Sequence, residues 1–219
     1  MEFVEYPDTD MMFLSLAQML SRELRNALTR RERALIALPG GTTPGPLLDL
    51  LSAAEVDWDR VDIIPGDERC VPPDHPRSNA GLIRARLLRG KAAAARLIPL
   101  WQADSTPAQT AATLEPLLPI DIALLGMGID MHTASLFPGA DALAAALATD
   151  APVLVPISAP GGSEPRVTLS ARVLRDAFAI HLLIAGAEKR AALDRALKLP
   201  PIEAPVSAVL ANATVHWAP

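Results

Sequence analysis

The stretch that decides the fold is Ala34-Leu35-Ile36-Ala37-Leu38, a continuous apolar run that ends at Pro39-Gly40-Gly41. A short apolar run closed by turn residues is typical of a strand that is buried on both faces, as in a parallel sheet. Further runs of this type lie at residues 61–64, 120–125 and 179–184. We expect these four runs to be buried strands of this kind.

Helical patterns separate the four apolar runs. The longest covers residues 9–30, where leucines recur at helical spacing. Shorter helical patterns lie near residues 44–53, 78–89, 106–117, 187–198 and 203–211. Strands that alternate with helices imply parallel strands joined by crossovers, and hence a layered α/β fold. No repeat or linker divides the chain, so we expect a single domain over residues 1–219, with a mobile surface loop at Pro160-Gly161-Gly162-Ser163.

Composition narrows the class of protein. The 219 residues carry a formal net charge of −5, 50% are apolar and only 4% are aromatic. An acidic, aromatic-poor chain argues against nucleic-acid binding, which needs a basic face or stacking platforms. No apolar stretch is long enough to span a membrane, and the acidic N-terminus lacks the layout of a signal peptide. The single cysteine, Cys70, fits a reducing compartment. We expect a soluble cytoplasmic protein with no nucleic-acid or membrane partner.

Unusual residues follow each expected strand, where open α/β sheets bind their ligands. After the first strand come Gly40, Gly41, Thr42 and Thr43, followed by Pro44 at the start of a helix. The glycines let a ligand approach the backbone, the threonine hydroxyls can donate, and the helix N-terminus favours a phosphate. The alternative is an ordinary tight turn with a threonine cap.

Three charged residues, Asp67, Glu68 and Arg69, follow the second strand. Arg69 can hold a phosphate or carboxylate through two hydrogen bonds, and either carboxylate can orient a substrate hydroxyl or a histidine. The alternative is a solvated charged loop. The neighbouring Cys70 is interpreted as a packed small residue rather than a nucleophile.

The clearest strand leads into Leu125-Gly126-Met127-Gly128-Ile129-Asp130-Met131-His132. The two glycines permit a tight turn, and Asp130 then stands two residues before His132. A carboxylate beside an imidazole fixes its tautomer and raises its basicity, so His132 is well suited to take a proton from water. The alternative is a histidine that caps or satisfies the core. No other His or Cys has ligand spacing to His132, so we expect no metal.

Two more cations follow later strands. Arg166 begins an expected strand, and Lys189 opens the helix after residues 179–184. A positive charge at a helix N-terminus opposes the helix dipole, which is easier to explain if an anion binds there. The alternative for Lys189 is a solvent-facing side chain.

Taken in order, these motifs resemble the 6-phosphogluconolactonases of the glucosamine-6-phosphate isomerase/deaminase superfamily. The motifs that carry the resemblance are Gly40–Pro44, the Asp-Glu-Arg-x-Val-Pro segment 67–72 with Ser78-Asn79, the block Leu125–Pro138 with Asp-x-His-Thr-Ala-Ser-Leu-Phe-Pro, the Arg-x-Thr-Leu segment 166–169, and Gly186 with Lys189. They span nearly the whole chain. The resemblance implies a three-layer α/β sandwich with a mostly parallel, Rossmann-like sheet flanked by helices.

The resemblance also implies an activity, the hydrolysis of 6-phospho-D-glucono-1,5-lactone to 6-phospho-D-gluconate without metal or organic cofactor. By similarity, His132 is the general base that activates water, Asp130 orients it, and Asp67 supports the ring hydroxyls or the histidine. The residues implied for the sugar and phosphate are Gly40, Gly41, Thr42, Thr43, Arg69, Arg166 and Lys189. We expect a monomer or weak homodimer.

One departure from the family pattern is Met131, because the block usually reads Asp-Gly-His. If the backbone there is left-handed, a methionine costs about 1 kcal/mol or more, and its side chain would crowd the pocket. This departure motivates one alternative, a non-catalytic sugar-phosphate-binding module. The other alternative is an amino-sugar-phosphate deaminase or isomerase, which carries a glutamate where this chain has Phe137.

Overall fold

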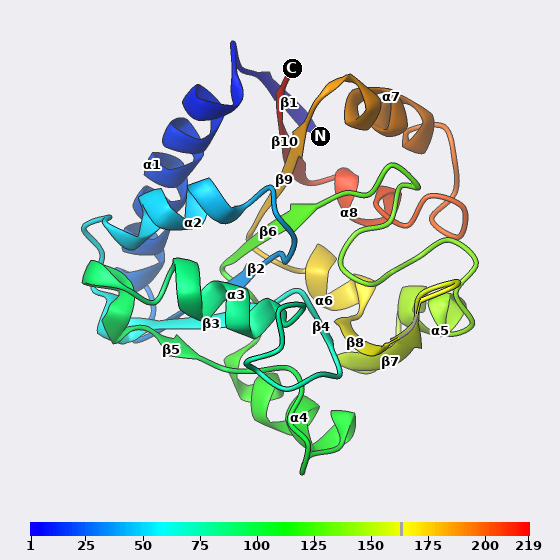
Figure 1. Cartoon of the computed structure of the whole chain (residues 1–219), viewed down its shortest axis with the longest axis horizontal. Helices are drawn as coiled ribbons and strands as arrows, with labels where there is room; N and C mark the ends of the chain where they lie inside the picture. The colour runs from blue at the N-terminus through cyan, green and yellow to red at the C-terminus, as the bar shows by residue number, and fades with distance from the viewer. Residues whose placement is uncertain (163) are drawn as a thin grey trace.

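The central sheet of the computed structural model has seven strands, all parallel, in the order β1-β10-β9-β6-β2-β3-β5 (Figure 1). Its strands are β1 (Glu2–Glu5), β2 (Ala34–Leu38), β3 (Val61–Pro65), β5 (Arg96–Leu97), β6 (Ile122–Gly126), β9 (Ala179–Ala185) and β10 (Ala213–Ala218). The expected mostly parallel sheet is therefore confirmed. The structure describes residues 1–162 and 164–219, so the predicted loop at 160–163 lies in part outside the described residues.

The core lies on both faces of this sheet. Along β2, Leu35 and Ala37 belong to one apolar cluster, whereas Ala34, Ile36 and Leu38 belong to the other. Successive side chains of a strand point to opposite faces, so a strand covered on both sides must be apolar at every position. This is why the decisive run reads as continuous rather than alternating.

Helices cover the two faces and complete the three layers (Figure 1). The helices are α1 (Thr9–Leu28), α2 (Gly45–Ser52), α3 (Asn79–Arg86), α4 (Pro107–Leu114), α5 (Leu143–Leu147), α6 (Ala171–Arg175), α7 (Ala187–Ala196) and α8 (Ser207–Leu210), with short 3-10 turns η1 (Trp58–Arg60), η2 (Gly90–Ala94) and η3 (Glu115–Leu117). The first three pack on one face, and α4 to α8 contribute to the cluster on the other. The pattern near residues 203–211 yields only the four-residue α8.

A second, three-stranded antiparallel sheet was not anticipated from the sequence. Its order is β4 (Asp67–Arg69), β8 (Pro165–Leu169), β7 (Leu154–Ser158). Strand β4 consists of three charged residues, so no apolar pattern marks it. Its pairing with β8 places Arg69 opposite Arg166 and Asp67 opposite Thr168. The small sheet thereby joins two segments that are about a hundred residues apart in the sequence.

The strands β1 and β10 were also not predicted. Strand β1 is a four-residue edge strand with glutamate at both ends, and β10 carries threonine and histidine among its apolar residues. Within the part of the chain that the structure describes, no helix is both long enough and apolar enough to cross a membrane.

Candidate active site

A cavity of about 290 Å³ opens where β2, β6 and β9 end. Parallel strands end at the same edge of a sheet, so the loops that follow them converge there. The small sheet and the first turn of α7 complete the walls. The polar side chains that line the cavity are Thr42, Thr43, Asp67, Arg69, Asn79, His132, Arg166 and Lys189. The cavity therefore collects the predicted site residues from five separate segments of the chain, with Asp130 just behind His132.

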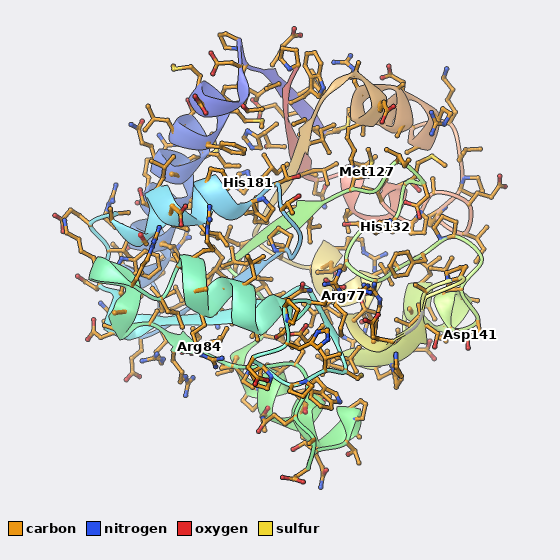
Figure 2. The ribbon with its side chains drawn as sticks, in the orientation of Figure 1. Arg77, Arg84, Met127, His132, Asp141 and His181 are labelled. Carbon is orange, nitrogen blue, oxygen red and sulfur yellow. The ribbon has the colours of Figure 1, made fainter. Side chains whose placement is uncertain are left out.

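His132 and Asp130 form a close pair in the loop after β6, where Figure 2 labels His132. The Nδ1 atom of His132 lies 2.5 Å from Oδ1 of Asp130. The hydrogen bond from His132 holds the pKa of the Asp130 carboxyl below its usual value, against an opposing effect of burial. With Nδ1 donating to a carboxylate, Nε2 is left unprotonated and can accept a proton. The predicted pairing of these two residues is thus present.

The close approach of His132 and Asp130 to the backbone, and not only the turn, requires glycine at position 128. A Cβ atom at Gly128 would lie 2.1 Å from His132 Nδ1 and 2.2 Å from Asp130 Oδ1. Both distances are far inside van der Waals contact, so any side chain at this position would push the imidazole and the carboxylate apart. The backbone N–H of Gly128 also donates to the carbonyl of His132 across the turn, at 2.9 Å.

Met131 occupies the left-handed backbone region, with φ of 67°. Its backbone is fixed on both sides, because its N–H donates to Gly128 and its carbonyl accepts from Val206. The side chain packs against the apolar cluster on the face of the sheet that α4 to α8 cover, and it does not line the cavity. The anticipated backbone strain is therefore present, whereas the anticipated crowding of the pocket is wrong.

Asp67 anchors a buried polar network on the cavity wall. Its Oδ1 accepts from Asn79 Nδ2 at 3.1 Å, and its Oδ2 accepts from the Ser135 hydroxyl. Nη1 of Arg166 lies 3.7 Å from the same Oδ2 and 3.4 Å from Ser135 Oγ. Among the described residues, the partners of the Asp67 carboxylate are these three and not His132. Asp67 is therefore close to Arg166 and makes no hydrogen bond to His132. The predicted support of the histidine by Asp67 is not found among these contacts.

Glu68 points away from the cavity and stabilises α3. Its buried carboxylate accepts backbone N–H groups of Arg69, Asn79 and Ala80 at 2.7 to 2.8 Å, and the Ser78 hydroxyl at 3.2 Å. A carboxylate at a helix N-terminus satisfies N–H groups that have no partner within the helix. Burial raises the pKa of Glu68, and the backbone hydrogen bonds oppose that shift. Of the two acidic neighbours, Asp67 therefore belongs to the site and Glu68 to the fold.

The loop from Gly40 to Thr43 forms another wall of the cavity. Gly40 lies against Asn79, since a Cβ there would be 1.9 Å from Asn79 Oδ1. Gly41 has φ of 88°, which favours glycine. These two residues bring the backbone close to the cavity, in agreement with the interpretation of this turn as a ligand-binding loop.

Three cations face the cavity from different elements. Burial lowers the pKa of Arg166 and of Lys189, with nearby Asp67 and Asp130 acting in the opposite direction. Lys189 lies in the first turn of α7 and donates to the carbonyl of Met127. Arg69 donates to the carbonyl of Arg77 at 2.6 Å. Buried or partly buried cations with few carboxylate partners suit an anionic ligand.

Sequence reasoning did not assign roles to Asn79, Ser135 or Phe137. Asn79 and Ser135 hold Asp67, and the ring of Phe137 packs 4.5 Å from that of His132. All three stand inside the motifs of the family resemblance, which was their only signal. No local pattern separates Ser135 from other serines, because its partners come from β4 and β8.

The remaining histidines and the cysteine lie outside the cavity. His181 is buried in β9 and His216 in β10, where they bond to each other at 3.0 Å. Burial raises the pKa of the Cys70 thiol, which fits a packed residue rather than a nucleophile. Within residues 1–162 and 164–219, no three His, Cys, Asp or Glu side chains gather in a way that would hold a metal ion.

Comparison with known proteins places the chain in an enzyme family. Residues 7–217 match the family of glucosamine-6-phosphate isomerases/6-phosphogluconolactonase, and the chain belongs to it. It is 41% identical to 6-phosphogluconolactonase of Mesorhizobium japonicum, over 98% of this chain and 94% of that protein. It is also 41% identical to 6-phosphogluconolactonase of Pseudomonas aeruginosa, over 93% and 89%.

A solved structure shows the same fold. The crystal structure of a 6-phosphogluconolactonase from Shewanella baltica superposes with a TM-score of 0.95 at 32% identity, covering 100% of this chain and 97% of that one. The α/β sandwich expected from the resemblance is therefore confirmed at the level of the whole chain.

Proposed function

We propose that the protein hydrolyses 6-phospho-D-glucono-1,5-lactone to 6-phospho-D-gluconate, the lactonase step of the oxidative pentose phosphate pathway. The observation that carries the proposal is the His132–Asp130 pair, which opens into a cavity lined by Arg69, Arg166 and Lys189. A base beside a group of cations suits an ester substrate that also carries a phosphate. The relatives named 6-phosphogluconolactonase support the same substrate.

The reaction needs few groups, because a lactone is an activated ester. His132 Nε2 removes a proton from water while the water oxygen bonds to C1 of the lactone. The bond between C1 and the ring oxygen then breaks, and His132 returns the proton to that oxygen. Asp130 stabilises the imidazolium that forms between these two steps. The cations of the cavity favour the negative charge that develops on the carbonyl oxygen.

The phosphate serves to position the ring. We propose that Arg69, Arg166 and Lys189, with the loop Gly40, Gly41, Thr42 and Thr43, hold the phosphate and the sugar, and that Asp67 acts by orienting Arg166. Binding energy from a remote phosphate fixes C1 against the base and so lowers the barrier.

The deaminase alternative is not supported by the site. It requires an ionisable side chain where this chain has Phe137, whose apolar ring packs against His132. The non-catalytic alternative rested on Met131, whose side chain lies outside the cavity.

A coupled assay tests the proposal. Fresh lactone is mixed with the protein, and 6-phosphogluconate is followed with 6-phosphogluconate dehydrogenase and NADP. We expect hydrolysis well above the spontaneous rate, unchanged after dialysis against a chelator because we propose that no metal takes part. A rate equal to the spontaneous one, or ammonia release from glucosamine 6-phosphate, would refute the proposal.

We further propose that the protein is cytoplasmic and a monomer or weak homodimer. The single Cys70 and the absence of an intramolecular disulfide suit a reducing compartment. Sedimentation velocity over a range of concentrations measures the oligomeric state directly.

A further inference from the structure

The ring of Phe137 contacts two residues of the cavity that come from different elements. Its centroid lies 4.5 Å from that of the His132 imidazole, with 41° between the ring planes. The guanidinium carbon of Arg166 lies 5.2 Å from the same centroid. Phe137 itself is only 8% exposed. One buried ring therefore touches both the base in the loop after β6 and the cation on β8.

Neither neighbour is fully held by hydrogen bonds. His132 is bound through Nδ1 to Asp130, and a single bond of this kind leaves the imidazole free to tilt about it. Arg166 has only long contacts, 3.4 Å to Ser135 and 3.7 Å to Asp67, and its Nε has no partner among the described residues. Packing against the Phe137 ring can therefore fix the orientation of the His132 imidazole and the Arg166 guanidinium.

We infer that Phe137 is a positioning residue, which sets the tilt of His132 and the placement of Arg166 and so couples the base to the anion-binding side of the cavity. This inference rests on the proposed lactonase function. An aromatic face attracts a guanidinium more strongly than an aliphatic side chain does, and the attraction grows where water is excluded. The ring also offers a flat surface to the imidazole, which the smaller, rounded side chain of leucine lacks.

The coupling predicts a particular kinetic signature. Loss of the ring disorders His132, which acts in the chemical step, and Arg166, which acts in binding. Replacing Phe137 should therefore change kcat and KM together, whereas a general loss of stability changes the amount of active enzyme and lowers the apparent kcat alone.

The test compares Phe137→Leu with Phe137→Tyr, which keeps the ring, and with Phe13→Leu as a matched control. Phe13 is 7% exposed and lies in α1, among the residues of the cluster on the other face of the sheet. For Phe137→Leu we expect about a three- to tenfold fall in kcat and a similar rise in KM, the size of a desolvated cation–π or aromatic contact. Phe137→Tyr should stay within about twofold of the parent for both constants, and Phe13→Leu should leave both unchanged per folded molecule.

A double-mutant cycle isolates the contact with Arg166. In an Arg166→Gln background, Phe137→Leu should no longer raise KM, because the cation that the ring positions is gone. The inference fails if the two effects on KM multiply, or if Phe137→Leu matches Phe13→Leu in both constants while the parent protein hydrolyses the lactone.

A measurement without turnover separates the inference from the proposed function. If the parent protein does not hydrolyse the lactone, calorimetry with 6-phosphogluconate and nitrogen NMR of the His132 imidazole still decide the role of Phe137. Weaker ligand binding and a changed His132 signal in Phe137→Leu, both restored in Phe137→Tyr, would support it. Unchanged values would overturn it.

Discussion

At Met131 the effect of the backbone angle on stability can be measured separately from the effect of the side chain. Its φ of 67° disfavours any residue with a Cβ, while its side chain gains packing against the core. Replacing it with alanine keeps the strain and removes the packing, whereas glycine removes both. We therefore expect Met131→Gly to be more stable than Met131→Ala, with a free energy of unfolding in urea that is about 1 kcal/mol higher. Equal stabilities of the two variants would show that the backbone there carries no strain.

Both Met131 variants should also retain lactonase activity within about twofold, because the side chain lies outside the cavity. A large gain in kcat for Met131→Gly alone would mean that the methionine hinders the reaction after all.

His132 is the residue on which the proposed chemistry depends. His132→Ala should fold normally, because the side chain is partly exposed and sits in a loop. Its kcat should fall about 10²- to 10⁴-fold, the usual contribution of a positioned general base. Asp130→Asn should lower kcat by less, since the imidazole remains but loses the carboxylate that orients it. A His132→Ala variant that keeps its kcat would remove this residue from the mechanism.

The residues that line the cavity could be predicted from the sequence, but their connections to one another could not. Asp130 and His132 are two residues apart, so their pairing is a local matter that spacing reveals. The roles of Asp67 and Glu68 are decided by which side of β4 each one faces, and therefore by the pairing of β4 with β8. Ser135 and Phe137 both contact Arg166 on the distant strand β8, and no residue near them in the sequence indicates these contacts.

At the scale of elements, α3 depends on the buried carboxylate of Glu68. The amide of Glu68→Gln would turn an N–H donor toward the backbone N–H groups of Asn79 and Ala80. We expect a loss of about 1 to 3 kcal/mol in the free energy of unfolding, measured in urea, because buried N–H groups are left poorly matched. The exposed Glu55 provides the control, and Glu55→Gln should change stability by less than about 0.5 kcal/mol. Similar losses in both variants would contradict the role of the Glu68 carboxylate in accepting the first backbone N–H groups of α3.

The elements that the sequence revealed are those that the core covers on both sides. Strands β2, β3, β6 and β9 are almost entirely buried and mostly apolar, with Asp62 and His181 as exceptions, and their predicted bounds agree with the structure within two residues. Strand β1 has a neighbour on one side only, so its residues need not be apolar. Strand β7 carries an exposed proline on a short sheet, which hides it from a hydrophobic pattern. Such strands form because distant partners are already in place.

At the scale of the whole molecule, a chain of side chains ties the two ends of the sequence to the sheet. Tyr6 Oη lies 2.9 Å from His216 Nδ1, His216 Nε2 lies 3.0 Å from His181 Nδ1, and His181 Nε2 lies 2.9 Å from Glu23. One order of protons satisfies every contact: Tyr6, His216 and His181 each donate to the next member, ending at the Glu23 carboxylate. We propose that residues 1–219 form one domain. Within it, this row of hydrogen bonds joins β10, β9 and α1 to Tyr6, which directly follows β1.

The same chain makes stability depend on pH. Burial, together with the nearby His181, lowers the pKa of His216 from 6.5 to about 3. Between these two values the unfolded chain binds a proton at His216 that the folded chain does not, so acid favours unfolding. The contribution of His216 is therefore complete above pH 6.5 and is lost as the pH falls toward 3.

This dependence can be measured by difference. From pH 7 to pH 5, His216 should account for a fall of about 2 kcal/mol in the free energy of unfolding. His216→Gln removes the titrating group, so its stability should fall by about 2 kcal/mol less over that range, although the variant is less stable at pH 7 because it repacks a buried position. If His216→Gln and the parent lose equal stability between pH 7 and pH 5, then burial does not keep the proton off His216 in the folded state.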